Sequence, residues 1–245
     1  MKVLATYNIK GGVGKTSTAV NLAYLAAREG RRTLLWDLDP QASATFLFRV
    51  RARVKGGGHD LVTRRRPVER ALKATDFDNL DLLPADFSYR NMDLELDETK
   101  GRTKRLGQLL DSLAGDYDLV FLDCPPSVSL VSENVLRATD TLLVPLIPAT
   151  LSLRTFEQLT RFIARSPGRR PEVVAFFSMA DRRKRLHRDV IDTMPRDHAR
   201  VAQTVVPALS IIEQMAVHRA PVPAFAPSSR AARCYEQLWA EVRPA

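Results

Sequence analysis

A glycine-rich segment close to the first residue places the strongest limit on the fold. Residues 10–16 read K-G-G-V-G-K-T; they follow a short apolar run at 3–5 and precede a segment, 18–28, whose apolar side chains recur with the period of a helix. A glycine turn between a strand and a helix N-terminus offers free backbone N–H groups and a partial positive charge, which suit an anion. The pattern therefore predicts a phosphate-binding loop.

This loop departs from the general phosphate-loop pattern at one position. That pattern, G-x-x-x-x-G-K-[ST], combines backbone donors, a lysine that reaches the terminal phosphates and a hydroxyl that binds magnesium. Gly14, Lys15 and Thr16 fill its last three places, but Ile9 stands where the first glycine belongs. A second lysine, Lys10, lies beside this departure and has no place in the general pattern.

Two further apolar runs end in aspartates. Residues 33–36 are followed by Asp37 and Asp39, and residues 119–122 are followed by Asp123. Both runs have the length and composition of buried strands. Because ligands of open parallel sheets bind at the carboxyl ends of the strands, we expect all three carboxylates to lie near the phosphate-binding loop.

Three segments in this order resemble the deviant Walker A ATPases of the ParA/MinD family, in the SIMIBI class of P-loop proteins. They are K-G-G-V-G-K-T at 10–16, L-L-W-D-L-D-P-Q-A-S-A-T at 34–45 and Y-D-L-V-F-L-D-C-P-P-S at 117–127. The resemblance extends through most of the chain and is nearest to the ParA-type ATPases that partition or position a cargo. It implies that the protein binds ATP and Mg²⁺ and hydrolyses ATP to ADP and phosphate.

The resemblance implies that three residues act in catalysis. Lys15 reaches the phosphates bound by its own subunit, and Lys10 reaches across a nucleotide-sandwich homodimer to the phosphates bound by the partner. Asp39 orients the attacking water. Negative charge gathers on the transferring phosphoryl group, so cationic donors aimed at it lower the barrier. A lysine supplied by the partner makes the closed state, or hydrolysis, conditional on dimerisation.

The same motifs imply the metal and nucleotide ligands. Thr16 binds Mg²⁺ directly, and Asp37 and Asp123 hold it through water. Pro207 lies where the family has its adenine-contacting loop. The implied nucleotide-binding residues are Lys10, Gly11, Gly12, Val13, Gly14, Lys15, Thr16, Ser17 and Pro207.

Strand and helix patterns alternate along the chain, which is typical of an α/β fold with a doubly wound, mostly parallel sheet and helices on both faces. By resemblance this is the P-loop NTPase fold. We expect one domain over residues 1–245, because 245 residues with 45% hydrophobic content can bury one large core. The basic segment 49–74 is interpreted as a surface excursion and 89–107 as a polar helix or loop. Further strands are predicted at 80–83, 141–147, 173–179 and 204–206, and helices at 109–114, 151–165 and 228–242.

Cysteine content and hydropathy predict the compartment. The two cysteines, Cys124 and Cys234, are too few for a disulfide framework and fit a reducing cytoplasm. No apolar run approaches the roughly 20 residues that span a bilayer. The first strand begins at once, which leaves no room for a signal peptide or for a helix-turn-helix module. We therefore expect a cytoplasmic protein that has no membrane partner and does not bind a specific operator.

The charge balance favours an acidic polymer as partner. Lys and Arg outnumber Asp and Glu by 37 to 28, which gives a net charge of +9. Partition members of the family bind duplex DNA without sequence preference when dimerised by ATP, and they use basic residues from the C-terminal third. Many of them carry arginines where this chain has 208–212, A-L-S-I-I, so DNA contact must be organised differently. The candidate DNA-binding residues are Arg182, Arg183, Lys184, Arg185, Arg188, Arg196, Arg200, Arg230 and Arg233.

Three functions agree with these features. The first is a ParA-type ATPase that cycles between an ATP-bound dimer on the nucleoid and a released form. A cargo-adaptor protein stimulates it, and the cargo is a plasmid, a chromosome or a protein organelle. The second is a MinD-like membrane-cycling regulator, but the tail at 231–245 contains Glu236 and Glu241 and reads better as a docked helix. The third is a metabolic member of the superfamily, which commonly adds cysteine ligands or substrate loops that are not evident in this sequence.

Overall fold

An eight-stranded sheet forms the centre of the computed structural model, which describes residues 1–166, 168–197 and 200–244 apart from the side chains of 195–197. The strand order is β3-β4-β2-β5-β1-β6-β7-β8, and neighbouring strands are parallel except for the antiparallel pair β3 and β4. The strands are β1 (Lys2–Thr6), β2 (Thr33–Asp37), β3 (Lys73–Ala74), β4 (Leu80–Leu83), β5 (Leu119–Asp123), β6 (Thr141–Leu146), β7 (Glu172–Ala180) and β8 (Val201–Pro207).

The central strands are apolar throughout because both faces of the sheet are covered. Every residue of β2 and of β5 is buried, as expected for parallel strands between two layers of helices. Their side chains alternate between two hydrophobic clusters: Leu34 and Trp36 belong to one and Leu35 to the other. The predicted doubly wound, mostly parallel sheet is confirmed.

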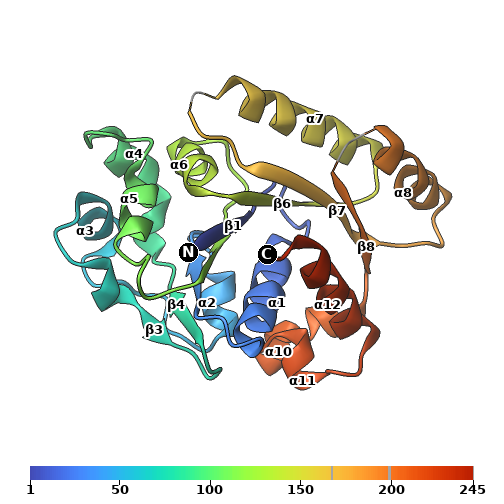
Figure 1. Cartoon of the computed structure of the whole chain (residues 1–245), viewed down its shortest axis with the longest axis horizontal. Coiled ribbons are helices and arrows are strands. Elements are labelled where there is room, and N and C mark those ends of the chain that lie inside the picture. The colour runs from blue at the N-terminus through green and yellow to red at the C-terminus, as the bar shows by residue number, and fades with distance from the viewer. Residues whose placement is uncertain (167, 198–199, 245) are drawn as a thin grey trace.

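Helices cover the two faces in separate layers (Figure 1). The layer that contains α1 and α12 packs on one face, and the layer of α3 to α8 packs on the other. Within the described ranges, no helix is both long and apolar enough to cross a membrane. The helices are α1 (Lys15–Arg28), α2 (Ser43–Leu47), α3 (Gly57–Thr63), α4 (Met92–Asp97), α5 (Arg105–Asp111), α6 (Leu130–Ala138), α7 (Thr150–Arg165), α8 (Arg185–Asp197), α9 (Ser210–Glu213), α10 (Met215–His218), α11 (Val222–Phe225) and α12 (Arg230–Val242), with 3₁₀ turns η1 (Val68–Ala71) and η2 (Phe87–Asn91).

The basic segment 49–74 is not the surface excursion that its sequence suggests. It contains α3, η1 and β3, and it buries Leu61 and Val62 in the same cluster as the sheet. Gly56, the N-cap of α3, and Gly57, its first residue, adopt left-handed conformations, with φ of 86° and 64°. These turns interrupt the apolar spacing, so no helical period is visible in the sequence although the segment is part of the core.

Some other elements differ from their predicted limits. α1 begins at Lys15, three residues before the predicted start, because Gly14 adopts the left-handed conformation at its N-cap. α5 covers Arg105–Asp111 rather than 109–114. β8 extends to Pro207, which is therefore the last residue of the edge strand rather than part of the loop after it. A proline is tolerated there because an edge strand has a free side that needs no N–H donor.

The burial of Leu61 predicts a stability effect. Leu61→Ala should lower the free energy of unfolding by about 2 to 5 kcal/mol, as large-to-small substitutions in cores do, because this side chain is only 3% exposed. Urea denaturation followed by circular dichroism measures it. Leu94→Ala is the matched control; Leu94 is 70% exposed, and its loss should change stability by no more than about 0.5 kcal/mol. Equal effects of the two substitutions would show that Leu61 does not contribute to the core and that 49–74 is a surface segment.

Candidate active site

The glycine loop joins β1 to α1 and is shaped by two left-handed residues. Gly12 has φ of 68° and Gly14 has φ of 91°, backbone conformations that residues other than glycine rarely adopt. Gly14 also lies against β7, since a Cβ built on it would be 3.6 Å from Ser178 Oγ. The N-terminal N–H groups of α1 follow directly, so the loop and the helix together form the predicted anion site.

Neighbouring strands hold the loop in place. Asn8 Nδ2 donates to the Pro145 carbonyl of β6 at 2.8 Å, and Asn8 Oδ1 accepts from Lys10 N at 2.9 Å. Ser178 Oγ donates to the carbonyl of Val13 from β7. The motif itself did not single out Asn8 and Ser178. Asn8 is 2% exposed, and a polar residue just after an apolar strand is the one signal that could have identified it.

The two lysines of the loop are in different environments. Lys15 is buried, and its ammonium donates to the carbonyl of Lys10 at 3.0 Å. Burial lowers the pKa of Lys15, and the nearby Asp123 opposes that shift. Lys10 is half-buried, and it is absent from the described residues that line the cavity over the loop. Its action on a partner subunit remains a prediction.

Asp37 and Asp123 lie side by side at the carboxyl ends of β2 and β5. They are register partners, and both are fully buried. Asp37 Oδ2 accepts from Thr45 N at 2.8 Å and from Thr45 Oγ1 at 2.7 Å, and Oδ1 accepts from Asp39 N at 3.2 Å. Burial raises the pKa of Asp37 to about 6, although these hydrogen bonds oppose the shift. Thr45, in α2, thereby ties the segment after Asp39 to the buried carboxylate.

Asp123 has less support from the protein. Its Oδ1 accepts from Thr6 Oγ1 at 3.4 Å, but its buried Oδ2 has no hydrogen-bond partner among the described residues. Burial, first, and then the charge of Asp37 raise the pKa of Asp123 well above its usual value, while Thr16 and Lys15 oppose the rise. An unpartnered carboxylate oxygen beside a threonine hydroxyl provides oxygen ligands that suit Mg²⁺. The residues present thus fit the predicted metal.

The protein alone supplies few metal ligands. In the described ranges, no three or more His, Cys, Asp or Glu side chains group together as a metal site. Mg²⁺ commonly binds through one or two carboxylates and completes its shell with water and substrate phosphates. The buried pair of acids is consistent with an ion that arrives with a nucleotide.

A cavity of about 400 Å³ opens over the loop. Asp39 lies at its edge with Oδ1 accepting from Gln41 N at 2.9 Å, which holds the carboxylate in a tight turn. Of the predicted nucleotide-binding residues, Gly11, Gly12, Gly14, Lys15, Thr16, Ser17 and Pro207 line the cavity, whereas Val13 is buried behind it. Met179, Val206 and Leu209 form an apolar wall beside Pro207. The sequence did not indicate these three residues, since they come from the end of β7, the end of β8 and the loop after β8, all distant from the glycine loop in the chain.

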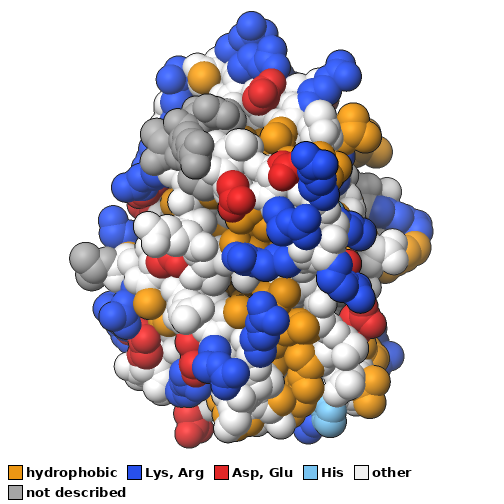
Figure 2. All heavy atoms as spheres, turned by 90° about the vertical axis from the view of Figure 1, so that its right-hand side faces the viewer, with side chains coloured by type: hydrophobic (Ala, Val, Ile, Leu, Met, Phe, Trp, Pro, Cys, Tyr) orange, Lys and Arg blue, Asp and Glu red, His pale blue; other side chains and the backbone are white. Residues whose placement is uncertain are grey.

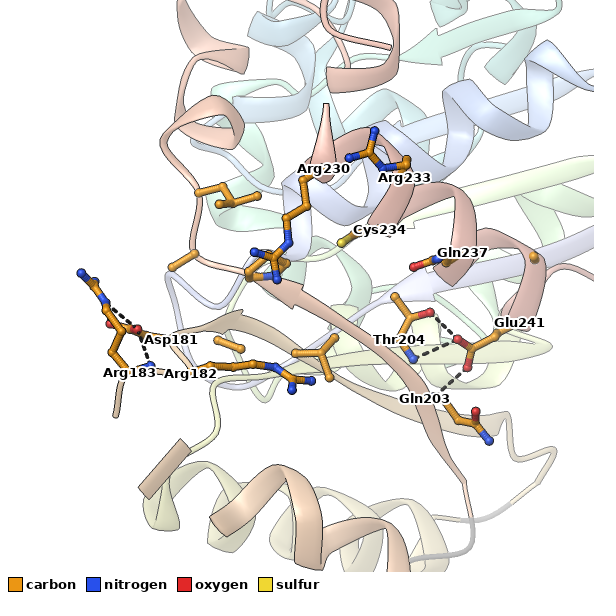
Figure 3. A pocket seen from close by; sticks show the side chains of 16 residues that line it. Asp181, Arg182, Arg183, Gln203, Thr204, Arg230, Arg233, Cys234, Gln237 and Glu241 are labelled. Atoms are coloured by element: carbon orange, nitrogen blue, oxygen red, sulfur yellow. Dashed lines mark hydrogen bonds and ion pairs between the residues drawn. The ribbon is translucent and has the colours of Figure 1, made fainter. Parts of the chain in front are cut away.

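A second, larger cavity of about 1160 Å³ lies between the edge strand β8 and α12 (Figure 3). Four of the nine predicted DNA-binding residues line it: Arg182, Arg183, Arg230 and Arg233. Arg183 pairs with Asp181 at 2.9 Å and turns outward, while Arg230 points from α12 toward β8. Arg233 donates to the Ser228 carbonyl at 2.6 Å, whereas the guanidinium groups of Arg182 and Arg230 have neither an ion-pair nor a hydrogen-bond partner among the described residues. This cavity, with its two unpaired guanidinium groups, is called the β8 groove below.

The other predicted DNA-binding residues are dispersed. Arg185 lies 3.8 Å from Asp189, Arg188 donates to the Arg182 carbonyl at 2.7 Å, and Arg200 pairs with Glu172. Lys184 is exposed in the turn before α8. Arg196 belongs to α8, but its side chain lies outside the described residues. Figure 2 shows the side of the molecule that carries the β8 groove, where Lys and Arg side chains gather around an apolar strip.

Comparison with known proteins agrees with this geometry. A family model described as an AAA domain matches residues 1–170. The sporulation initiation inhibitor protein Soj of Bacillus subtilis is 33% identical over 98% of this chain and 98% of its own length. The chain belongs to the ParA/MinD family of P-loop ATPases.

A further relative and a solved structure are also similar to this chain. The chromosome partitioning protein ParA of Caulobacter vibrioides is 38% identical over 69% of this chain and 64% of its own length. The crystal structure of cobyrinic acid a,c-diamide synthase from Mycobacterium smegmatis superposes with a TM-score of 0.82 and 28% identity, over 98% of this chain and 93% of the other. That structure holds ADP and magnesium.

The buried acids predict how the metal-free ParA/MinD-family protein responds to substitution and pH. Asp123→Asn should raise its melting temperature at pH 7 by at least about 2 to 4 °C, the shift that roughly 1 kcal/mol produces in a domain of this size. The reason is that folding must otherwise bury a charge or take up a proton. Differential scanning fluorimetry measures the effect, with the exposed Asp111→Asn as the control that should change nothing.

The sign of the pH dependence follows from the same groups. Both folded-state pKa values lie above the ordinary 3.8, that of Asp37 at about 6, so the folded protein binds more protons than the unfolded chain above about pH 4. Their contribution to stability therefore falls as the pH rises through that window. The gap between Asp123→Asn and the parent should shrink as the pH is lowered from 7. A gap that widens on acidification would show that these carboxyls do not carry the effect.

Proposed function

We propose that residues 1–245 act as one ParA-like ATPase domain that pairs around ATP and Mg²⁺ and positions a cargo in the cytoplasm. The observation that carries this proposal is the unpartnered Oδ2 of Asp123, which lies buried beside Thr16 under a loop shaped for phosphates. The likeness to Soj over nearly the whole chain supports a role in partition. A cargo-adaptor protein stimulates the ATPase, and the cargo is a plasmid, a chromosome or a protein organelle.

Different residues of the chain have different roles in ATP hydrolysis. Backbone N–H groups of the loop and of α1 bind the phosphate oxygens, and the Lys15 ammonium exchanges the carbonyl of Lys10 for a phosphate. Thr16, Asp37 and Asp123 hold Mg²⁺, which neutralises charge on the phosphoryl oxygens when it is bound. Asp39, at the edge of the cavity, orients the attacking water.

Lys10 acts on the nucleotide of the partner subunit. Its backbone is held by Asn8, so the start of the loop is rigid, while the side chain is half-buried outside the cavity of its own subunit. In the proposed dimer its ammonium completes the cationic shell around the partner's phosphates. Hydrolysis then depends on pairing, because one protomer lacks this charge.

Substituting Lys15 and substituting Lys10 should therefore have different effects. Lys15→Ala should abolish ATP binding, measured by titration calorimetry. Lys10→Ala should keep an ATP affinity within about threefold of the parent while its turnover falls at least tenfold, equivalent to about 1.4 kcal/mol of barrier. Light scattering after size exclusion with ATP and Mg²⁺ should show fewer dimers. The exposed Lys100→Ala is the control, and a Lys10→Ala protein that pairs and turns over like the parent would refute this role.

Duplex DNA is the proposed platform, and the β8 groove is its main contact. Two unpaired guanidinium groups, those of Arg182 and Arg230, line a wide groove next to the exposed turn that holds Lys184. Contacts to phosphates alone produce binding without sequence preference. Pro207 and Leu209 line both this groove and the nucleotide cavity, so nucleotide binding and DNA binding share a wall. ATP-bound dimers then associate with the nucleoid.

A salt series tests the DNA contact. The parent with ATP should bind a 30-bp duplex of random sequence more tightly than with ADP or without nucleotide, as measured by fluorescence anisotropy. The groove variant, Arg182→Gln with Arg230→Gln, should bind more weakly, and its slope of log K against log salt should be smaller by about 2, at roughly 0.9 per lost phosphate contact. An unchanged slope would remove these arginines from the DNA interface.

A metabolic role is the second candidate, because the 28% identical structure is that of a cobyrinic acid a,c-diamide synthase. Turnover driven by a small substrate, with no retention on DNA in ATP, would favour it. The MinD-like alternative has less support. The apolar face of α12, including Tyr235, Leu238 and Trp239, is buried against the sheet layer and α1, so it is occupied within the fold and does not present a membrane-binding face.

A further inference from the structure

Most of the net positive charge of the chain lies outside the groove described above. Residues 49–73 contain nine lysines and arginines but only two acids, Asp60 and Glu69, so this segment carries seven of the nine net positive charges. The segment includes α3 and η1 and ends in β3, at one edge of the sheet, whereas the β8 groove lies at the other edge (Figure 1).

Three of these nine side chains are used within the fold. Arg49 pairs with Asp76 at 3.3 Å, Arg66 pairs with Asp60 at 3.0 Å, and Arg64 donates to the Gln108 carbonyl. The other six are exposed and have no ion-pair or side-chain hydrogen-bond partner among the described residues. They are Arg51, Arg53, Lys55, Arg65, Arg70 and Lys73.

Part of this charge converges on one hollow. Lys55, Arg66 and Arg70 line a cavity of about 220 Å³ whose other walls are the apolar residues Val54, Leu61, Pro67 and Ala71. α3 itself carries no Lys or Arg; four of the six free cations lie in the turns on either side of it, and Arg70 and Lys73 lie in η1 and β3. Val54, Leu61 and Val68, which are buried in the core, anchor α3 and these turns, so the positive charge lies on an ordered part of the surface.

The composition of this surface favours a nucleic acid over a protein. Protein interfaces have an apolar or aromatic centre, but none of the large exposed hydrophobic side chains of the described structure lies within 49–73. A phosphate backbone needs only dispersed cationic contacts, which release counterions when they form. Six unpaired cations without an exposed apolar anchor match the second kind of partner.

We propose that the exposed basic residues of 51–73 form a second surface that binds the phosphate backbone of duplex DNA. It lies at the β3 edge, opposite the β8 groove, and is called the β3-edge surface. This inference rests on the proposed function in taking duplex DNA as the polyanion. With cationic surfaces at opposite edges of the sheet, one protomer contacts two separate stretches of duplex. The segment begins just after α2, whose Thr45 donates a hydrogen bond to Asp37, so it is close in the chain to a residue that contacts a buried carboxylate.

Removing each surface separately and together tests the proposal. The β3-edge variant carries Lys55→Gln, Arg65→Gln and Arg70→Gln, and it is made in the full chain and in the groove variant. The charge-matched control carries Arg31→Gln, Lys100→Gln and Arg165→Gln, three exposed positions outside both surfaces. Binding of the 30-bp duplex is measured by anisotropy with ATP between 50 and 200 mM salt, and ATP affinity and thermal melting verify that each variant folds.

The expected result is residual duplex binding by the groove variant that the combined variant loses. At 50 mM salt the affinity should fall at least tenfold between the two, and the salt slope should fall by about 2 to 3, at roughly 0.9 per contact. The charge-matched control in the groove variant should leave both unchanged. Equal duplex binding by the groove variant and the combined variant would overturn the proposal.

The outcomes separate this inference from the proposed function. A parent that binds no duplex at any salt concentration would refute DNA as the platform together with the β3-edge surface. A parent that binds, with a groove variant that loses all binding, would keep the platform and refute the β3-edge surface. Polyglutamate serves as a probe for an acidic protein partner. A β3-edge variant that loses polyglutamate binding but keeps duplex binding would replace DNA with an acidic protein segment at this surface.

Discussion

Two carboxyl groups are buried side by side at the carboxyl ends of the central strands β2 and β5, and the protein stabilises them unequally. Three hydrogen bonds reach Asp37, whereas Oδ2 of Asp123 has no partner in the described structure. A buried charge without compensation costs free energy, which the folded chain recovers by holding a proton or by binding a cation. The opposing contributions of Thr16 and Lys15 are too small to cancel that cost. These residues thus suit a cation that binds together with phosphates.

The surrounding fold brings this pair and the glycine loop together. β1 lies beside β5, which lies beside β2. The loop after β1 and the acids at the ends of β5 and β2 therefore meet at the carboxyl ends of the central strands. Strands β6 and β7 then hold the loop from its other side, through Pro145 and Ser178. Because the backbone of the loop is restrained before a ligand arrives, its N–H groups need little reorganisation to bind phosphate.

The number of Lys and Arg residues in a segment of the sequence does not show how many of those charges are neutralised in the fold. The cluster at 182–188 is the densest, but Asp181 and Asp189 pair with two of its arginines, and Arg188 bonds to backbone carbonyls. Glu241 also accepts hydrogen bonds from Gln203 N and Thr204 N, so a carboxylate closes part of the free edge of β8 inside the groove. The segment 49–73 contains only two acids, Asp60 and Glu69, and although Asp76 pairs with Arg49, six of its nine cations have neither an ion-pair nor a side-chain hydrogen-bond partner in the described structure.

Short-range patterns in the sequence were enough to predict the phosphate-binding loop, the strands that end in Asp37 and Asp123, and a doubly wound parallel sheet. These features depend on short-range rules, such as the need for glycine at positive φ and the apolar character of strands buried on both faces. Only the tertiary structure showed that 49–74 belongs to the core, that Asn8 and Ser178 anchor the loop, and that Arg182 and Arg230 share a groove. Each of these depends on contacts between residues far apart in the chain, and no sequence period records which distant side chain fills a given space or neutralises a given charge.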